Sequence, residues 1–302
     1  MLERFYKSPP CCENLSRTIR ELAACYHQLK VFSIGKSLLG RDITALSIGN
    51  PTGATCFVGA THGLEWLTTT LLIKFCHGLL QAMASGGNLS EIDVGIALRS
   101  RSLVIIPSLN PDGVEIAIHG AKSAGKCCEF VECASGERRP QEVWQANAAG
   151  VDLNHNFDAG WLTLKQMEID AGIVCPGPTR YGGQHPHSEL ETIAITTFCR
   201  SCQPRSLYSF HSQGEEIYWH YGPNTPDRSK IMAQILASSS GYELAKPAEL
   251  ASHGGLKDWF IEKMRRPAFT IEIGRGKNPL GLNQLESIYR KTEEMMMIAA
   301  LL

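Results

Sequence analysis

The chain alternates between two hydrophobic patterns that predict different secondary structures. Some segments are runs of consecutive apolar residues, which are typical of buried strands, and others carry an apolar residue every three or four positions, which is typical of helices. We predict strands over 31–34, 43–48, 54–60, 102–107, 206–211 and 267–274. We predict helices over 15–29, over 66–83 and from about 188 to 199. This order of elements indicates an α/β protein.

The strand, helix and strand between residues 54 and 107 form a βαβ unit. Such units build a largely parallel sheet with helices on both faces. Ligands of these sheets collect at the carboxyl ends of the strands. Candidate chemistry is therefore expected directly after the predicted strands.

Two segments without a clear period are predicted as surface loops. Residues 120–141 are polar and rich in glycine, lysine and cysteine, and residues 175–187 are rich in glycine and proline. The second loop is expected to line a cleft. Ser188, followed three residues later by Glu191, predicts a capping box at the start of the next helix.

His62 and Glu65 follow the strand 54–60 directly and are separated by two residues. This spacing sets an imidazole and a carboxylate on the same side of a turn, where both can bind one metal ion. Catalytic zinc usually has three protein ligands, and two histidines with one glutamate are among the known sets. His211, at the end of the strand 206–211, is the best candidate for the second histidine.

Glu272 lies within the apolar strand 267–274. An ionised carboxylate is costly to bury unless a partner compensates it, so Glu272 calls for a functional explanation. Two of the metal candidates have ordinary alternatives: His211 as a hydrogen-bonded core histidine, and Glu65 as a carboxylate that stabilises a helix N-terminus. Their joint occurrence with Glu272 favours a metal site.

Composition excludes several classes of function. A formal net charge of -1 provides no basic surface for nucleic acid. The apolar runs are far shorter than a membrane span, and the N-terminus lacks the charged and then apolar plan of a signal peptide. No repeat or composition change marks a domain boundary. We therefore expect a single cytoplasmic domain over residues 1–302, without a signal peptide or propeptide and without a membrane partner.

The 11 cysteines are expected to be reduced thiols, because their number is odd and no export signal precedes them. Cys199 and Cys202 form a C-x-x-C pair, but no second pair with metal-ligand spacing follows. We expect these two residues to pack in a helix rather than to hold a structural zinc ion.

Ordered motifs along the chain resemble those of zinc metallocarboxypeptidases of the carboxypeptidase A type. They are His62-x-x-Glu65, Asn110-Pro111-Asp112-Gly113, Asp152-Leu153-Asn154-x-Asn156-Phe157, His211-Ser212 and Thr270-Ile271-Glu272. The resemblance implies a three-layer α/β/α fold around a central mixed, mostly parallel sheet of about eight strands. It also implies one Zn²⁺ per chain, held by His62, Glu65 and His211, with Glu272 as the general base. Such a site hydrolyses amide bonds.

Several positions depart from the digestive members of that family. The arginine that binds the substrate's terminal carboxylate beside Asn154 is His155 here, and the arginine that polarises the carbonyl is Gln145. Their mobile tyrosine falls near Leu250, and the residue at the base of the specificity pocket falls at Lys257. A histidine, unlike an arginine, is cationic only near or below neutral pH. Asn154, His155, Gln145 and Lys257 are the candidate substrate-binding residues.

Two questions stay open from the sequence. Arg180, Arg275 and Asn147 are all candidates to replace the missing carbonyl-polarising arginine, and their spacing does not rank them. Lys257 would either bind an acidic or zwitterionic leaving residue or lie on the surface as an ordinary solvated lysine.

Residues 152–161, 181–183, 188–192 and 211–219 are similar to those of bacterial γ-D-glutamyl-diaminopimelate peptidases. This similarity implies cleavage of the bond between D-glutamate and diaminopimelate in peptides derived from peptidoglycan, so the expected partner is a small muropeptide. One alternative is a metallocarboxypeptidase or deacylase acting on other acyl-amino acids or short peptides. The other is a zinc-bound peptide-binding protein that has lost catalysis. The oligomeric state is not predicted.

Overall fold

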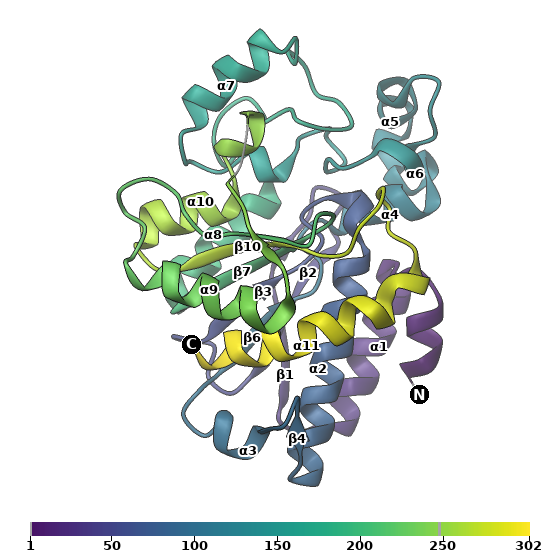
Figure 1. Ribbon diagram of the computed structural model, residues 1–302. Helices are drawn as coiled ribbons and strands as arrows, with labels where there is room; N and C mark the ends of the chain where they lie inside the picture. The colour runs from purple at the N-terminus through teal and green to yellow at the C-terminus, as the bar shows by residue number, and fades with distance from the viewer. Residues whose placement is uncertain (1, 247–248) are drawn as a thin grey trace.

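We describe the fold from a computed structural model, which covers residues 2–246 and 249–302 (Figure 1). The main sheet has eight strands in the order β1-β2-β6-β3-β7-β10-β8-β9. These strands are β1 (Leu29–Lys36), β2 (Asp42–Ile48), β3 (Thr55–Val58), β6 (Leu103–Ile106), β7 (Ser206–His211), β8 (Glu216–Tyr218), β9 (Glu243–Leu244) and β10 (Ala268–Glu272). A separate two-stranded sheet is formed by β4 (Asn88–Leu89) and β5 (Ile92–Asp93).

The centre of the main sheet is parallel. β6, β3, β7 and β10 run in the same direction. At one edge β1 is antiparallel to β2, and β2 is antiparallel to β6. At the other edge β8 is antiparallel to β10 and parallel to β9. The predicted mixed, mostly parallel sheet of eight strands is confirmed.

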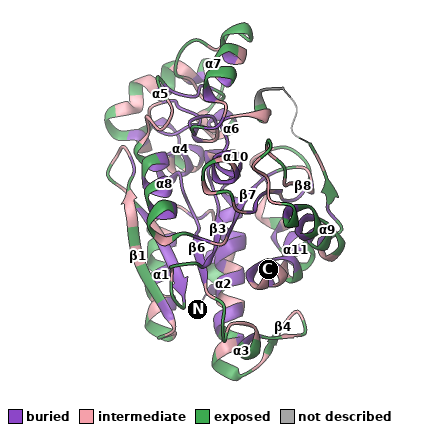
Figure 2. Ribbon diagram, turned by 90° about the vertical axis from the view of Figure 1, so that its left-hand side faces the viewer, coloured by how far each residue is buried: buried purple, intermediate pink, exposed green. Residues whose placement is uncertain are grey.

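Helices cover both faces of the sheet (Figures 1 and 2). The longer helices are α1 (Cys12–Cys25), α2 (Leu67–Ser85), α4 (Pro111–His119), α7 (Trp161–Asp170), α8 (Leu190–Cys202), α9 (Arg228–Ser240) and α11 (Leu285–Leu301). The shorter ones are α3 (Val94–Ala97), α5 (Cys128–Ser135), α6 (Pro140–Val143) and α10 (Leu256–Trp259). α1, α2, α9 and α11 pack on one face, and α8 and α10 pack on the other, which makes three layers. No helix in the described residues is long and apolar enough to cross a membrane.

Side chains of the central strands alternate between the two faces, as the pleat of a strand requires. In β3, Phe57 enters the core formed with α2, whereas Cys56 and Val58 enter the core formed with α8. β7 and β10 divide their apolar side chains in the same way. Because both faces are buried, these strands appear in the sequence as continuous apolar runs.

Residues 120–141 are not the surface loop that the sequence predicts. They form a 3-10 helix, η3 (Ala121–Cys127), followed by α5 and α6. Ala124 and Val131 are fully buried and pack with Trp144 in a third core cluster. The prediction fails because each helix is too short to show a helical period, and glycine and lysine interrupt the apolar positions.

The predicted capping box at Ser188 and Glu191 is also wrong. The side chain of Glu189, the N-cap residue of α8, makes no capping hydrogen bond. The Glu191 carboxylate instead accepts a hydrogen bond from the backbone N–H of Leu38 at 3.3 Å. A partner that is distant in sequence has replaced the local one. Residues 175–187 are irregular, as predicted.

All 11 cysteines lie in the part of the chain that the structure describes, and all are free thiols. Cys199 is buried in the core beneath α8, and Cys202 packs at the edge of the same core. This arrangement agrees with the predicted packing role for the C-x-x-C pair.

Candidate metal centre and active site

The predicted catalytic residues come together at the carboxyl ends of three neighbouring parallel strands. His211 ends β7 and Glu272 ends β10, and the two residues are partners in the register of this parallel pair. His62 and Glu65 follow β3, which pairs with the other side of β7. The sheet therefore delivers all four side chains to one region, where ligands of such sheets bind.

Close backbone packing holds the turn that carries His62. His62 is the N-cap residue of the 3-10 helix η2 (Gly63–Glu65). A Cβ atom at Gly63 would lie 2.3 Å from the carbonyl oxygen of Gly113, so a larger residue does not fit at this position. The Asn110 side chain donates to the carbonyl oxygen of the residue before His62 at 3.1 Å. The Asn110-Pro111-Asp112-Gly113 motif thus supports the turn.

Three side chains converge on one point. His62 Nδ1 lies 2.9 Å from Glu65 Oε1, and His211 Nδ1 lies 2.9 Å from Glu65 Oε2. The two Nδ1 atoms are 3.3 Å apart. Within the described residues, this is one of two groups of side chains that could hold a metal ion. Two imidazole nitrogens and a carboxylate are a donor set of catalytic zinc, so these residues fit that ion.

The outer nitrogen of each imidazole contacts a further side chain. His62 Nε2 lies 3.1 Å from Asp152 Oδ1, and His211 Nε2 lies 3.0 Å from Ser209 Oγ. Partners of this kind fix the tautomer and orientation of ligating histidines. Both inner Nδ1 atoms are thereby directed at Glu65. Sequence reasoning misses both partners, although Asp152 lies within one of the family motifs.

The charges in this group stabilise one another. Burial alone would raise the pKa of Glu65, but the adjacent His62 and His211 lower it to about 2. Burial likewise opposes a charge on His62, whereas Glu65 and Asp152 raise the pKa of His62 well above its usual value. Against the effect of burial, His62 also lowers the pKa of Asp152 far below its usual value. The carboxylates therefore stabilise positive charge between them.

Glu272 lies at the end of β10 and is half-buried. Burial of the carboxyl group, together with the nearby Glu65 carboxylate, raises the pKa of Glu272 well above its usual value. Across the antiparallel pair with β8 its partner is Glu216, whose carboxylate accepts a hydrogen bond from the Tyr218 hydroxyl. Glu272 is within electrostatic reach of Glu65 and His62, two of the three converging side chains.

This arrangement agrees with the comparison of the whole sequence with known families. The sequence model of the zinc carboxypeptidase family, Peptidase M14, matches residues 15–297. The chain belongs to the zinc carboxypeptidase family. It is a zinc metallopeptidase by that membership, and the resemblance indicated by the ordered motifs is confirmed.

Relatives and solved structures agree with this membership. The γ-D-glutamyl-L-diamino acid endopeptidase 1 of Lysinibacillus sphaericus is 33% identical over 273 residues, which are 90% of this chain and 67% of that protein. Bovine thrombin-activatable fibrinolysis inhibitor, solved with tick carboxypeptidase inhibitor, has a TM-score of 0.75 at 17% identity and covers 98% of this chain and 97% of its own. Murein-tripeptide amidase MpaA from Escherichia coli O157 has a TM-score of 0.53 at 20% identity, with 89% and 91% covered. These two structures show the shared fold.

In this member of the zinc carboxypeptidase family, the predicted counterpart of the carboxylate-binding arginine is His155. His155 is buried, and its Nδ1 lies 2.9 Å from the carbonyl oxygen of Arg180 and 3.1 Å from Glu168 Oε1. Glu168 is itself fully buried and pairs with Lys165 at 2.9 Å. Glu168 and the Arg180 carbonyl oxygen are thus the two partners of His155 Nδ1, and the sequence offers no signal for Glu168. Substrate binding by His155 stays a prediction.

Asn154 and Gln145 both make contacts within the protein. Asn154 Oδ1 accepts a hydrogen bond from the backbone N–H of Leu256 at 3.1 Å. The Gln145 side chain accepts a hydrogen bond from the hydroxyl of Thr179, which precedes Arg180. Gln145 therefore supports the segment that carries Arg180. Direct contact of either side chain with substrate stays a prediction.

Lys257 is buried, so it is not the exposed surface lysine that the sequence left as an alternative. Its Nζ donates to the Asp258 carboxylate and, at 3.1 Å, to the carbonyl oxygen of His220. The same Nζ lies 5.5 Å from the centre of the Tyr221 ring. The Leu250 side chain, the predicted counterpart of the mobile tyrosine, lies outside the described residues.

The three candidates for the missing arginine differ in their surroundings. Asn147 is fully buried, and its amide donates to a glutamate carboxylate at 2.6 Å. Arg275 Nε pairs with Glu215 at 2.8 Å. Arg180 is exposed, and its backbone N–H donates to Asp152 Oδ2 at 2.9 Å. Arg180 is therefore joined through Asp152 to the metal-binding group.

Proposed function

We propose that this chain hydrolyses the amide bond between a γ-linked D-glutamyl residue and a diamino acid in small peptides derived from peptidoglycan. The convergence of His62, Glu65 and His211 beside Glu272 is the observation that carries the proposal. Two similar proteins support the substrate class. One is named a γ-D-glutamyl-L-diamino acid endopeptidase, and the other is named a murein-tripeptide amidase.

His62 Nδ1, His211 Nδ1 and the Glu65 carboxylate would hold one Zn²⁺ at this site. When bound there, zinc polarises a carbonyl and lowers the pKa of water toward neutrality. Asp152 and Ser209 keep the inner nitrogen of each imidazole directed at Glu65. Glu65, whose pKa is lowered to about 2, is ionised throughout the neutral range.

Glu272 is the group that would move the proton. Its carboxylate takes a proton from the attacking water as the new C–O bond forms at the glutamyl carbonyl. It then gives that proton to the leaving nitrogen as the C–N bond breaks. The products are a glutamyl carboxylate and a diamino acid with a free amine. The register of β7 and β10, which sets Glu272 beside His211, supports this role.

The presence of Lys257 favours a substrate whose leaving residue carries an additional negative charge. Lysine is rarely buried unless it is paired, and here it contacts Asp258 and a backbone carbonyl. An ammonium group has three donors, so these two acceptors do not exhaust it. Diaminopimelate carries a carboxylate at each end. One of these groups suits Lys257, and His155 is the candidate for the other.

Arg180 is the cation that we assign to the scissile carbonyl. Its φ is 69°, a left-handed conformation that is uncommon for a residue with a side chain. Its backbone N–H donates to Asp152 Oδ2, and its carbonyl oxygen lies 2.9 Å from His155 Nδ1. A strained backbone that active-site residues hold in place favours a functional role. The exposed guanidinium would stabilise the negative charge that develops on the carbonyl oxygen.

A peptidase assay tests this proposal. It measures how fast the zinc-loaded chain releases diaminopimelate from L-alanyl-γ-D-glutamyl-diaminopimelate. We expect turnover of this tripeptide and little turnover of a blocked peptide that ends in phenylalanine. Turnover of the phenylalanine peptide alone would favour a metallocarboxypeptidase or deacylase acting on other substrates. Binding of the tripeptide without turnover of either peptide would favour a protein that has lost catalysis.

A further inference from the structure

A second group of metal-binding side chains lies where α1 meets α4. Among the described residues, Cys11, Glu115 and His119 each offer a ligand atom, and these atoms lie within 4.8 Å of one another. Cys11 is half-buried. The Glu115 side chain is 12% exposed and the His119 side chain is 51% exposed. The group therefore has one shielded side and one side open to solvent.

The two helices bring these residues together from separate parts of the chain. Glu115 and His119 are four residues apart on α4, so they share one face of that helix. Cys11 is the N-cap residue of α1, and its side chain makes no capping hydrogen bond. The backbone N–H of Cys11 donates to the carbonyl oxygen of Pro9 at 2.9 Å. This turn holds the backbone of Cys11, and with it the base of the thiol side chain, beside α4.

The two oxygens of Glu115 have different surroundings. Oε1 accepts a hydrogen bond from the backbone N–H of Cys12 at 2.5 Å. Oε2 lies 3.9 Å from His119 Nε2, which is too far for a hydrogen bond. The nearby Arg41 is paired with Asp112 at 2.6 Å. A carboxylate oxygen, an imidazole nitrogen and a thiol sulfur therefore lie close enough together to approach one metal ion.

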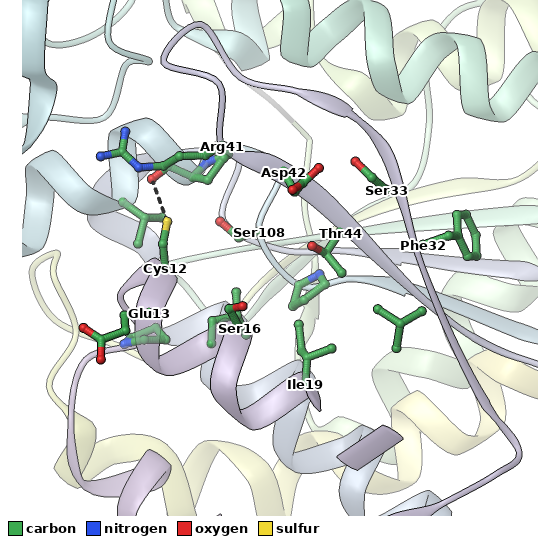
Figure 3. Close-up of a pocket in the computed structure, with 16 residues that line it drawn as sticks. Cys12, Glu13, Ser16, Ile19, Phe32, Ser33, Arg41, Asp42, Thr44 and Ser108 are labelled. Carbon is green, nitrogen blue, oxygen red and sulfur yellow. Dashed lines mark hydrogen bonds between the residues drawn. The ribbon is translucent and has the colours of Figure 1, made fainter. Parts of the chain in front are cut away.

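The thiol next in sequence is directed elsewhere. Cys12 Sγ lies 3.8 Å from the carbonyl oxygen of Pro111, and Figure 3 shows this contact as a dashed line. Cys12, Arg41 and Ser108 are among the residues lining a cavity of about 550 Å³ beside α1 (Figure 3). Cys11 is the thiol that faces Glu115 and His119.

We propose that Cys11, Glu115 and His119 form a second metal site, suited to zinc, that fastens α1 to α4. Zinc accepts sulfur, nitrogen and oxygen ligands together, whereas Mg²⁺ and Ca²⁺ require oxygen. A thiolate and a carboxylate balance the charge of Zn²⁺. Ligand atoms around a tetrahedral zinc lie roughly 3.3–3.8 Å apart. The three ligand atoms lie within 4.8 Å of one another, and the half-exposed His119 side chain has room to rotate toward the other two.

This site would act on stability rather than on chemistry. An ion that binds the folded chain and not the unfolded chain raises the melting temperature in proportion to the logarithm of its concentration. Cys11, Glu115 and His119 contribute no ligand to the catalytic group of His62, Glu65 and His211. Turnover should therefore not depend on the second ion.

A cobalt titration followed by absorption tests the proposal. Co²⁺ bound to a thiolate shows a sulfur-to-metal charge-transfer absorption, and the catalytic group contains no cysteine. We expect this absorption to reach one equivalent per chain in the natural protein and to be absent in Cys11→Ser. His119→Ala should weaken this binding at least about tenfold. Cys25→Ser, at the exposed end of α1, is the matched control and should keep the absorption.

Two further readouts separate this site from the catalytic one. Zinc should still raise the melting temperature of Glu65→Gln, and this increase should disappear when Cys11→Ser is added. If Cys11→Ser fails to fold, His119→Ala at its exposed position serves the same purpose. The proposal is overturned if the natural protein shows no sulfur-to-cobalt absorption up to millimolar Co²⁺, or if Cys11→Ser keeps it. Neither outcome depends on the peptidase substrate.

Discussion

Asp152 Oδ1 lies 3.1 Å from His62 Nε2, and the other oxygen of the same carboxylate accepts a hydrogen bond from the backbone N–H of Arg180 at 2.9 Å. One buried carboxylate thus links the orientation of a metal-binding imidazole to the position of the arginine assigned to the scissile carbonyl. The burial of Asp152 keeps water from competing for either contact.

Asp152→Asn should lower the zinc affinity of the catalytic site by about 10- to 100-fold, because an amide is a weaker acceptor for the His62 N–H. Competition against a chromophoric chelator measures this affinity. Asp158→Asn is the matched control, since the Asp158 side chain is 55% exposed and contacts a surface lysine. Equal zinc affinity in both variants would argue against the orienting role of Asp152.

Arg180→Ala should lower kcat by about 100-fold or more, because a donor to a developing oxyanion acts mainly in the transition state. KM should change less than kcat. Arg275→Ala removes an exposed arginine that pairs with Glu215, and it should leave kcat within about twofold of the natural value. If Arg275→Ala lowers kcat more than Arg180→Ala does, Arg275 is the residue that polarises the scissile carbonyl.

Lys257→Met should reduce kcat/KM for the diaminopimelate tripeptide at least about tenfold more than for the same peptide ending in alanine. Methionine keeps the length of the side chain and removes its charge. Burial already raises the pKa of Asp258, so this neighbour can become neutral when the lysine is absent. Because both peptides are measured on the same variant, a loss of folded protein lowers both rates equally and does not change their ratio.

The control for Lys257 is Lys246→Met, an exposed lysine beside the same group of loops. This variant should treat both peptides as the natural protein does. If Lys257→Met lowers kcat/KM equally for the two peptides, Lys257 does not recognise an acidic group of the substrate.

Glu191 is predicted to make stability depend on pH. Burial, with a smaller contribution from Asp112, raises the pKa of Glu191 from 4.5 to about 7. The folded chain therefore holds this proton more tightly than the unfolded chain, and the free energy of unfolding falls as the pH rises from about 4.5 through about 7. Deprotonation of Glu191 lowers the free energy of unfolding by an amount on the order of 3 kcal/mol.

Urea unfolding at pH 5 and pH 8 checks this dependence. Glu191→Gln should lose most of the difference between the two values, whereas Glu137→Gln, at an exposed position, should keep it. If Glu191→Gln shows the full natural difference, the dependence arises from other groups.

The sequence predicted what depends on local patterns. β7 and β10, which end at His211 and Glu272, and β3, which precedes Glu65, are buried on both faces, so they appear as apolar runs followed by polar residues. The short spacing of His62 and Glu65 is visible without any knowledge of the fold. These features predicted the strand ends at which the side chains of His62, Glu65 and His211 come together.

The sequence could not predict what depends on distant partners. His155 was predicted as a cation for substrate, yet its Nδ1 faces Glu168, which no local pattern links to it. Glu191 was predicted as part of a cap, but its carboxylate accepts a hydrogen bond from Leu38, which lies 153 residues earlier in the chain. The burial of Lys257 likewise depends on His220 from another loop. Pairings between loops are invisible in one sequence.

We infer that Glu272 drives zinc-dependent hydrolysis of a γ-D-glutamyl bond. The most direct test measures the release of diaminopimelate from L-alanyl-γ-D-glutamyl-diaminopimelate. It compares the natural protein with Glu272→Gln at equal zinc content. We predict turnover by the natural protein and a loss of at least about 1,000-fold in the variant, with zinc retained. No release by the zinc-loaded natural protein, or equal release by Glu272→Gln, would contradict the claim.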